Sequence, residues 1–314
     1  MEEDKRSKFA IDLTPLKKYP DFRNLWASGL ITYLGSMITY VAVPFQIKEI
    51  THSFLAVGLM GVVELVPLIV FGLYGGVLAD AVDRKKMVWA TEFAALIMTL
   101  LLLGNSLLPN PNLVLIYIVA GTFAALNGLQ RPSMDAILPR IVSHDDLPSA
   151  SALMSLRGQF GVIVAPAVAG IVISNYGATY GYLLDVITFV IALIFLYKVR
   201  NIPPSVNAAP PSFASLVEGL RYAVNRKDLL GTYLVDLAAM FFAMPTALIP
   251  FWADQLSAPW ALGLLYAAGT VGSIAIVLTS GWAKNVHFYG RAIMWAAIGW
   301  GVAIALSGMT NYLW

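Results

Sequence analysis

The sequence predicts an all-α integral membrane protein made of two parallel repeats: six helices in the first, and the first three helices of the second. Composition is one observation behind this prediction. Of the 314 residues 59% are hydrophobic and 12% charged, and the mean hydropathy is +0.74, more apolar than a water-soluble core requires. Long apolar segments and a repeat at constant spacing are the other two. Together they indicate that the lipid bilayer is the solvent of this chain.

Nine apolar segments are long enough to cross the hydrocarbon core, which takes about 20 residues in a helix. Their apolar runs are continuous rather than alternating, which favours helices over the strands of a membrane barrel. The expected spans are 24–44, 56–78, 87–107, 113–131, 152–174, 181–199, 229–250, 260–282 and 291–309.

The later part of the chain repeats the earlier part at an offset of 205 or 206 residues. Each repeated group stands at the same place in an apolar segment, as expected for two parallel bundles of membrane helices. The pairs are Val43-Pro44-Phe45 with Ile249-Pro250-Phe251 (250 − 44 = 206), Gly58 with Gly263 (263 − 58 = 205) and Gly76 with Gly281 (281 − 76 = 205).

The repeat predicts a first half at 1–200, a linker at 201–228 and an incomplete second half at 229–314. In the linker, Ser215 with Glu218 three residues later is typical of a capping box, which predicts a short amphipathic helix on the membrane surface. A full second copy would run past residue 400 (2 × 205 = 410). We therefore expect either part of a longer, truncated chain or a natural nine-span protein.

Lysine and arginine fall almost entirely in the connections of one side. This pattern predicts a multi-pass protein of the cell (inner) membrane with a cytoplasmic N-terminus. On the opposite side only the first connection carries a basic residue, Lys48. The basic residues of the expected cytoplasmic side are Lys5, Arg6, Lys8, Lys17, Lys18, Arg23, Arg84, Lys85, Lys86, Arg131, Arg140, Lys198, Arg200, Arg221, Arg226, Lys227, Lys284 and Arg291.

Several function classes are disfavoured by composition. A net charge of +2 without a basic patch predicts no nucleic-acid partner. The absence of cysteine excludes disulfides, thiolate metal sites and thiol catalysis. His52, His144 and His287 lie in separate turns without ligand spacing, so no metal or cofactor is expected. No nucleophile–base set and no phosphate loop is present, which argues against an enzyme.

The turn between the second and third spans combines a glycine, Gly76, an aspartate four residues later, Asp80, and the basic cluster Arg84–Lys86. With this turn, and with the runs Asp21–Trp26 and Arg131–Pro139, the chain resembles the major facilitator superfamily. It is most similar to the twelve-helix exporter branch that includes enterobactin exporters and macrolide efflux proteins. The resemblance covers the whole chain and implies the major facilitator fold.

In that family the turn locks one of two access states by gripping the second half. The gating turn implied here consists of Gly76, Asp80, Arg84 and Lys85. Asp80 and Arg84 stand four residues apart and can pair or bind a neighbouring helix end, while Gly76 permits close helix approach. Asp83 departs from the family glycine, and Asn285 leaves the matching turn of the second copy without its charge. A solvated basic turn is the alternative.

The fifth span contains a run of small residues around a proline. Gly161, Pro166 and Gly170 resemble the family's antiporter signature, with alanine at two of its glycine positions. Small residues beside a proline allow a helix to bend and to pack closely, as alternating access requires. The resemblance therefore favours export over import, although such residues also serve ordinary helix packing.

Ionisable residues inside a span are costly and usually face a cavity or a partner. Glu64 and Asp236 are candidate coupling or substrate groups, since a buried carboxylate can carry a proton, and Arg157 is their candidate cationic partner. A structural pair is the alternative for each. For Glu92 and Asp185, which stand closer to the interface, the stronger alternative is a structural pair or an end residue reaching for water.

The function that the resemblance implies is proton-coupled export of an amphipathic small molecule, siderophore or drug-like, by alternating access. Aromatic residues such as Phe160 and Tyr182 fit an adaptable apolar pocket or ordinary packing. The expected partners are the substrate, protons, the lipid bilayer and a periplasmic or outer-membrane efflux partner. The alternatives are a lipid or lysolipid mover of the same fold and a non-transporting fragment or scaffold.

Overall fold

The computed structural model describes residues 12–203, 221, 224–243, 248–279 and 289–309. Within these residues every regular element is a helix. The predicted surface helix of the linker, with Ser215 and Glu218, lies outside the described residues. So do Gly281 and Asn285 of the second copy. The domain boundaries therefore stay a prediction.

Six long helices form the first half, and each covers one of the first six predicted spans. They are α2 (Pro20–Thr51), α3 (Phe54–Ala81), α4 (Arg84–Ser106), α5 (Leu113–Ile141), α6 (Leu147–Tyr176) and α7 (Ala178–Tyr197), preceded by the short α1 (Thr14–Lys18). The helices α2 and α5 extend well beyond the predicted 24–44 and 113–131. An apolar run marks only the part of a helix in hydrocarbon, whereas its hydrogen bonding continues into the polar flanks.

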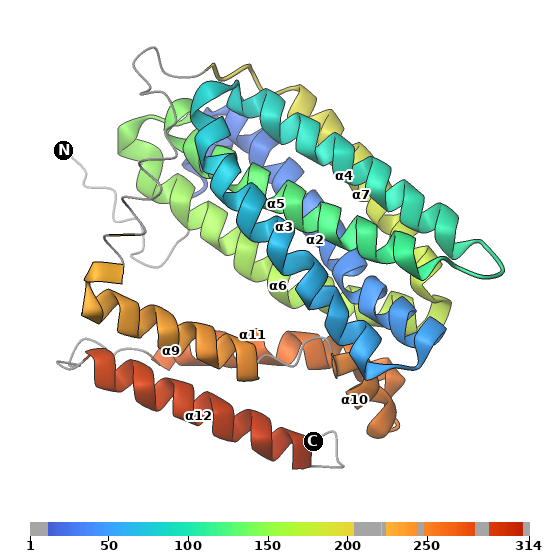
Figure 1. Ribbon diagram of the computed structural model, residues 1–314. Helices are drawn as coiled ribbons and strands as arrows, with labels where there is room; N and C mark the ends of the chain where they lie inside the picture. Colours follow the sequence, from blue (N-terminus) through green and yellow to red (C-terminus); the bar gives the residue numbers. More distant parts are fainter. Residues whose placement is uncertain (1–11, 204–220, 222–223, 244–247, 280–288, 310–314) are drawn as a thin grey trace.

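The second half contributes α9 (Lys227–Ala243), α10 (Ile249–Gln255), α11 (Leu262–Thr279) and α12 (Tyr289–Met309). These helices lie along one side of the six-helix bundle (Figure 1). Among the described residues seven helices are long and apolar enough to cross a membrane: α2 to α7 and α12. The predicted span 229–250 corresponds to α9 and the start of α10, with 244–247 between them outside the described residues.

Close glycine packing joins α3 to α5. A Cβ on Gly75 would lie 2.6 Å from the carbonyl oxygen of Gly128, and one on Gly128 would lie 2.6 Å from the backbone nitrogen of Gly72. Contacts this short leave no room for a side chain, so the two backbones meet directly. This contact lies beside Gly76, whose own surroundings are outside what the structure describes, so the close approach expected there stays a prediction.

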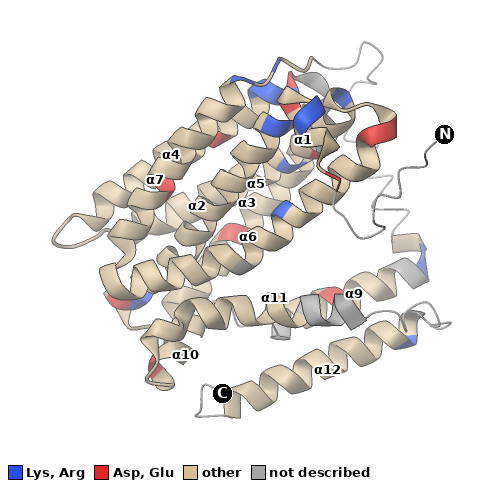
Figure 2. Cartoon of the chain, turned by 180° about the vertical axis from the view of Figure 1, so that it is seen from behind, with Lys and Arg blue, Asp and Glu red and all other residues tan. Residues whose placement is uncertain are grey.

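The bundle has two chemically different ends, which Figure 2 shows by colour. The basic end, where α2 begins and α5 and α7 finish, carries Lys17, Lys18, Arg140 and Arg200. The far end, where α2 finishes and α3 begins, carries Lys48. Apolar side chains fill the space between helices at both ends: Phe22 and Leu25 belong to the cluster at the basic end, and Val43 and Ile47 to the cluster toward the far end.

Candidate functional site

The two halves meet at the far end around a buried lysine. Lys48 of α2 forms an ion pair with Asp254 of α10, and its side chain is only 6% exposed. The ammonium group lies 5.6 Å from the ring centre of Phe45 and 5.9 Å from that of Phe251. These two phenylalanines are equivalent positions of the sequence repeat, so both copies contribute to one cation site.

Aromatic and glycine contacts extend this interface. Phe54 of α3 stacks on Phe251 at 3.9 Å between ring centres, and Tyr40 of α2 meets Tyr266 of α11 edge to face at 6.1 Å. A Cβ on Gly170 of α6 would overlap the backbone of Gly263 on α11. By contrast α9 and α12 pack chiefly against each other. The described contacts between the halves therefore lie mainly toward the far end.

The antiporter-like residues of α6 contact two neighbouring helices, α2 and α11. Gly161 lies under the ring of Tyr33 on α2, where a Cβ would overlap that ring. Pro166, with its backbone carbonyl, and Gly170 face Gly263 on the other side of the helix. Small residues therefore let α6 approach the first half and the second half at once. This places α6 where a movement between the halves would act.

Asp185 is fully buried within the first half, on α7. It accepts a short hydrogen bond from Thr39, a longer one of 3.4 Å from Thr99, and one of 3.3 Å from Thr188. Three helices, α2, α4 and α7, are thus joined by one carboxylate. Of the two alternatives for Asp185, a residue reaching for water is wrong, because its side chain is fully buried and bonded to threonines within the bundle.

Glu92 of α4 forms a second buried polar centre and is 6% exposed. It accepts 3.0 Å and 2.7 Å hydrogen bonds from Thr32 of α2 and Gln130 of α5. Arg157 of α6 is close enough to attract it, and Asp185 close enough to repel it. The interfacial reading of Glu92 is therefore also wrong, since it stands two turns inside α4 and is covered by neighbouring helices.

The three predicted coupling residues are not brought together. The charged group that faces Arg157 is Glu92, rather than Glu64 or Asp236. Glu64 is half-buried on α3, and its carboxylate has no hydrogen bond or ion pair with any described residue. Asp236 is exposed on α9. The roles of all three remain predictions. Tyr182 is fully buried and donates to Gln46, so it is a packing residue.

The predicted gating turn connects α3 to α4 at the basic end. Asp83 is the N-cap of α4 and accepts a 3.0 Å hydrogen bond from the backbone of Lys86, which explains an aspartate at the family's glycine position. Arg84 is 5% exposed, and Lys85 lies 5.5 Å from the ring centre of Tyr197 on α7. Gly76 and Asp80 fall within α3, but their side chains lie outside what the structure describes.

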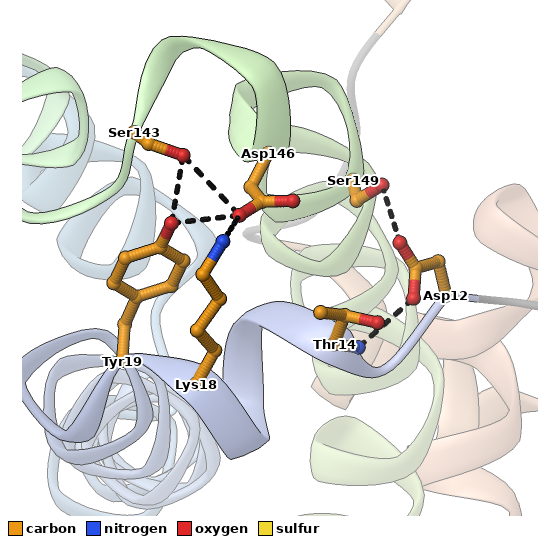
Figure 3. A network of polar contacts seen from close by, with 7 residues as sticks. All are labelled: Asp12, Thr14, Lys18, Tyr19, Ser143, Asp146 and Ser149. Atoms are coloured by element: carbon orange, nitrogen blue, oxygen red, sulfur yellow. Dashed lines mark hydrogen bonds and ion pairs between the residues drawn. The ribbon is translucent and has the colours of Figure 1, made fainter.

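A polar network at the basic end ties α1 to the start of α6 (Figure 3). Lys18 pairs with Asp146 at 2.7 Å, and the hydroxyl of Tyr19 lies 2.7 Å from both Asp146 and Ser143. These bonds hold the pKa of Asp146 below its ordinary value and raise that of Lys18. Sequence reasoning missed the network, because its members are 124 to 128 residues apart.

A second link in Figure 3 joins the same two segments. Asp12 accepts a 2.9 Å bond from the backbone of Thr14, and its other oxygen accepts a 2.9 Å bond from Ser149. The segment before α2 therefore lies along the beginning of α6 rather than extending away from the bundle.

Comparison with known proteins identifies the architecture. Residues 10–314 match the family described as transmembrane secretion effector, of the major facilitator type. The enterobactin exporter EntS of Shigella flexneri is 30% identical over 307 residues, which covers 97% of this chain and 73% of that protein. EntS of Escherichia coli O1:K1 / APEC is 30% identical over 312 residues, with the same coverage.

Solved structures show the same fold at low identity. The peptide transporter PepTSo is 14% identical with a TM-score of 0.54, over 89% of this chain and 58% of that one. A peptide transporter POT mutant in complex with alafosfalin is 12% identical with a TM-score of 0.55, over 85% and 68%. The chain thus spans less than two thirds of PepTSo. These likenesses support the fold alone.

The membrane-spanning helices, the family match and the likeness to EntS show that this chain is a multi-pass membrane exporter of the major facilitator type. The chain belongs to the transmembrane secretion effector family.

Proposed function

We propose that this chain exports an amphipathic small molecule, siderophore-like or drug-like, by alternating access of its two halves in exchange for protons. The observation that carries the proposal is the contact of the halves at the far end, through Lys48 and Asp254. The helices α9 and α12 pack chiefly against each other rather than against the first half, so the described contacts between the halves lie mainly at the far end. This arrangement fits a state that is closed at the far end.

The proposed orientation places the basic end in the cytoplasm and the protein in the inner membrane. Lysine and arginine gather at that end in Figure 2, as expected for cytoplasmic connections. With this orientation the far end is the outer end. The structure then represents the inward-facing state, in which an exporter takes up its substrate.

Two further parts of the proposal concern partners. The relatives are named for enterobactin, which supports a siderophore as one substrate class and a periplasmic or outer-membrane efflux partner to carry it onward. Proton exchange is proposed at Glu64 and Asp236, because carboxylates inside membrane spans are the groups that carry protons in transporters.

Everted membrane vesicles with an acidic interior provide the test. We expect gradient-dependent uptake of enterobactin or the acidic dye 8-anilinonaphthalene-1-sulfonate, which nigericin abolishes, and a changed pH dependence in Glu64→Gln and Asp236→Asn. Equal uptake with and without the gradient would exclude proton coupling, and no uptake of either probe would count against this substrate range. Competition by excess lysolipid would favour the lipid mover instead.

A further inference from the structure

Arg157 carries a buried polar group without a partner. Its guanidinium lies against Gly29 of α2, where a Cβ would overlap it. The Nη1 atom is buried and makes no hydrogen bond to any described residue. Buried polar groups almost always have a partner, and a charged donor left without one is costly. The described residues thus supply no acceptor for this donor.

Glu92 attracts the positive charge of Arg157, but its carboxylate oxygens accept hydrogen bonds from other residues instead of from the guanidinium. The two groups attract each other, yet one oxygen of Glu92 accepts from Thr32 at 3.0 Å and the other from Gln130 at 2.7 Å. These bonds direct the carboxylate toward α2 and α5. Among the described residues none accepts a hydrogen bond from this guanidinium, so the donors that do not face Gly29 are left for another acceptor.

The surface beside Arg157 is apolar and exposed. Leu156 is 42% exposed and Phe160 is 50% exposed. At helical spacing they share the side of α6 that carries Ala167, which contacts Gly263 of α11. The side of α6 that meets the second half at the far end thus continues, toward the basic end, as an exposed apolar strip. A molecule held between the halves would contact this strip and Arg157 together.

We infer that Arg157 is the docking point for an acidic group on the transported molecule, so that the substrate class is an amphipathic acid. A guanidinium matches carboxylate, phosphate or sulfonate oxygens in a bidentate arrangement, which a lysine does not reproduce. Leu156 and Phe160 contact the apolar part of the same molecule. The inference rests on the proposed function, because it places the molecule in the transport path between the halves.

Binding to the purified chain in zwitterionic nanodiscs tests the inference directly. The probes are 11-(dansylamino)undecanoic acid and its methyl ester, detected by energy transfer from the protein's tryptophans and corrected with empty nanodiscs. We expect the acid to bind more tightly than the ester. Arg157→Gln should weaken binding of the acid at least about tenfold and leave the ester unchanged, and Arg157→Lys should be intermediate.

The matched variants separate this role from a purely structural one. If Arg157 serves only as the counter-charge of Glu92, the Arg157→Gln defect will disappear in the Glu92→Gln/Arg157→Gln double variant. If Arg157→Gln disturbs folding, acid and ester binding will fall together. Either result, or equal affinity of the native chain for acid and ester, would overturn the inference. Because no gradient is used, failure of the transport assay would leave this measurement intact.

Discussion

Lys48 of α2 and Asp254 of α10 form an ion pair that joins the two halves, and the lysine is the buried member, with a side chain 6% exposed against 51% for the aspartate. Phe45 and Phe251, equivalent positions of the repeat, stand on either side of the ammonium group. Removing Asp254 would leave a buried cation with only ring faces and the more distant Glu49, at 3.7 Å. Opening of the far end requires that this pair break.

Asp254→Asn should therefore shift the population toward an open far end. Because the chain has no cysteine, spin labels can be placed at the exposed positions Leu55→Cys and Ser257→Cys, which leaves Lys48 and Glu49 unchanged, and their separation measured by double electron–electron resonance. We expect a longer distance to become populated, since the lost pair stabilises the closed state by about 1–2 kcal/mol for a partly exposed pair. The charge swap Lys48→Asp/Asp254→Lys should restore the short distance. An unchanged distribution in Asp254→Asn would show that the pair does not hold this end closed.

Gly170→Ala should destabilise the contact between the halves. The new Cβ would overlap the backbone of Gly263, and overpacking of this kind costs about 1–3 kcal/mol. Gly158→Ala on the same helix is the matched control, because a Cβ there has nothing within 4 Å. Thermal unfolding in detergent should show a lower midpoint for Gly170→Ala alone. Equal midpoints for the two variants would contradict the packing seen here.

Asp185→Asn and Glu64→Gln are the same chemical change in different surroundings. Asp185 accepts from three threonines, so its change should lower the free energy of unfolding by about 1–3 kcal/mol. Glu64 has no such bonds to described residues, so its change should cost less than about 0.5 kcal/mol. Chemical denaturation of the two variants checks this. A larger loss for Glu64→Gln would reverse the assignment of structural and coupling roles.

The attachment of α1 to the beginning of α6 should weaken in acid. Asp146 has a lowered pKa in the folded protein, first through its bond from Lys18 and then through that from Tyr19. The stabilisation is complete above the ordinary carboxyl pKa and is lost as pH falls through the lower folded value. A spin label at Leu13→Cys should become more mobile in that acid range. Mobility that rises instead on alkalinisation from neutral pH to about pH 9 would contradict the assignment.

Variants at the neighbouring lysines give the control for that experiment. Lys18→Ala should free the label already at neutral pH, because it removes the 2.7 Å pair with Asp146. Lys17→Ala should leave the label as immobile as in the native chain, since Lys17 is exposed and makes no hydrogen bond or ion pair with the described residues. Equal mobility in the two variants would show that the ion pair does not hold α1 in place.

Periodicity and composition were enough to predict the helices but not which of their faces meet. The all-helical membrane fold, the first six spans and the family were predicted correctly, because hydrocarbon requires long apolar helices. Against nine predicted spans, the described residues contain seven helices long and apolar enough to cross a membrane, and the repeat stays a prediction. The partners of the charged residues within the spans were not predicted correctly. Glu92 and Asp185 were assigned to the interface, and Arg157 was paired with Glu64 and Asp236 instead of with Glu92. Membrane helices are apolar on nearly all sides, so their sequences contain little information about orientation around the helix axis.

The sequence by itself determined that this chain crosses the membrane many times, that its later part copies its earlier part, and that it resembles exporters of the major facilitator type. Only the tertiary structure decided that Lys48 meets Asp254, that Gly170 meets Gly263, and that Arg157 lies beside Glu92 with a buried donor that no described residue accepts. The reason is physical. Span length depends on residues adjacent in the chain, whereas an ion pair or a glycine contact depends on how separate helices rotate and pack against one another.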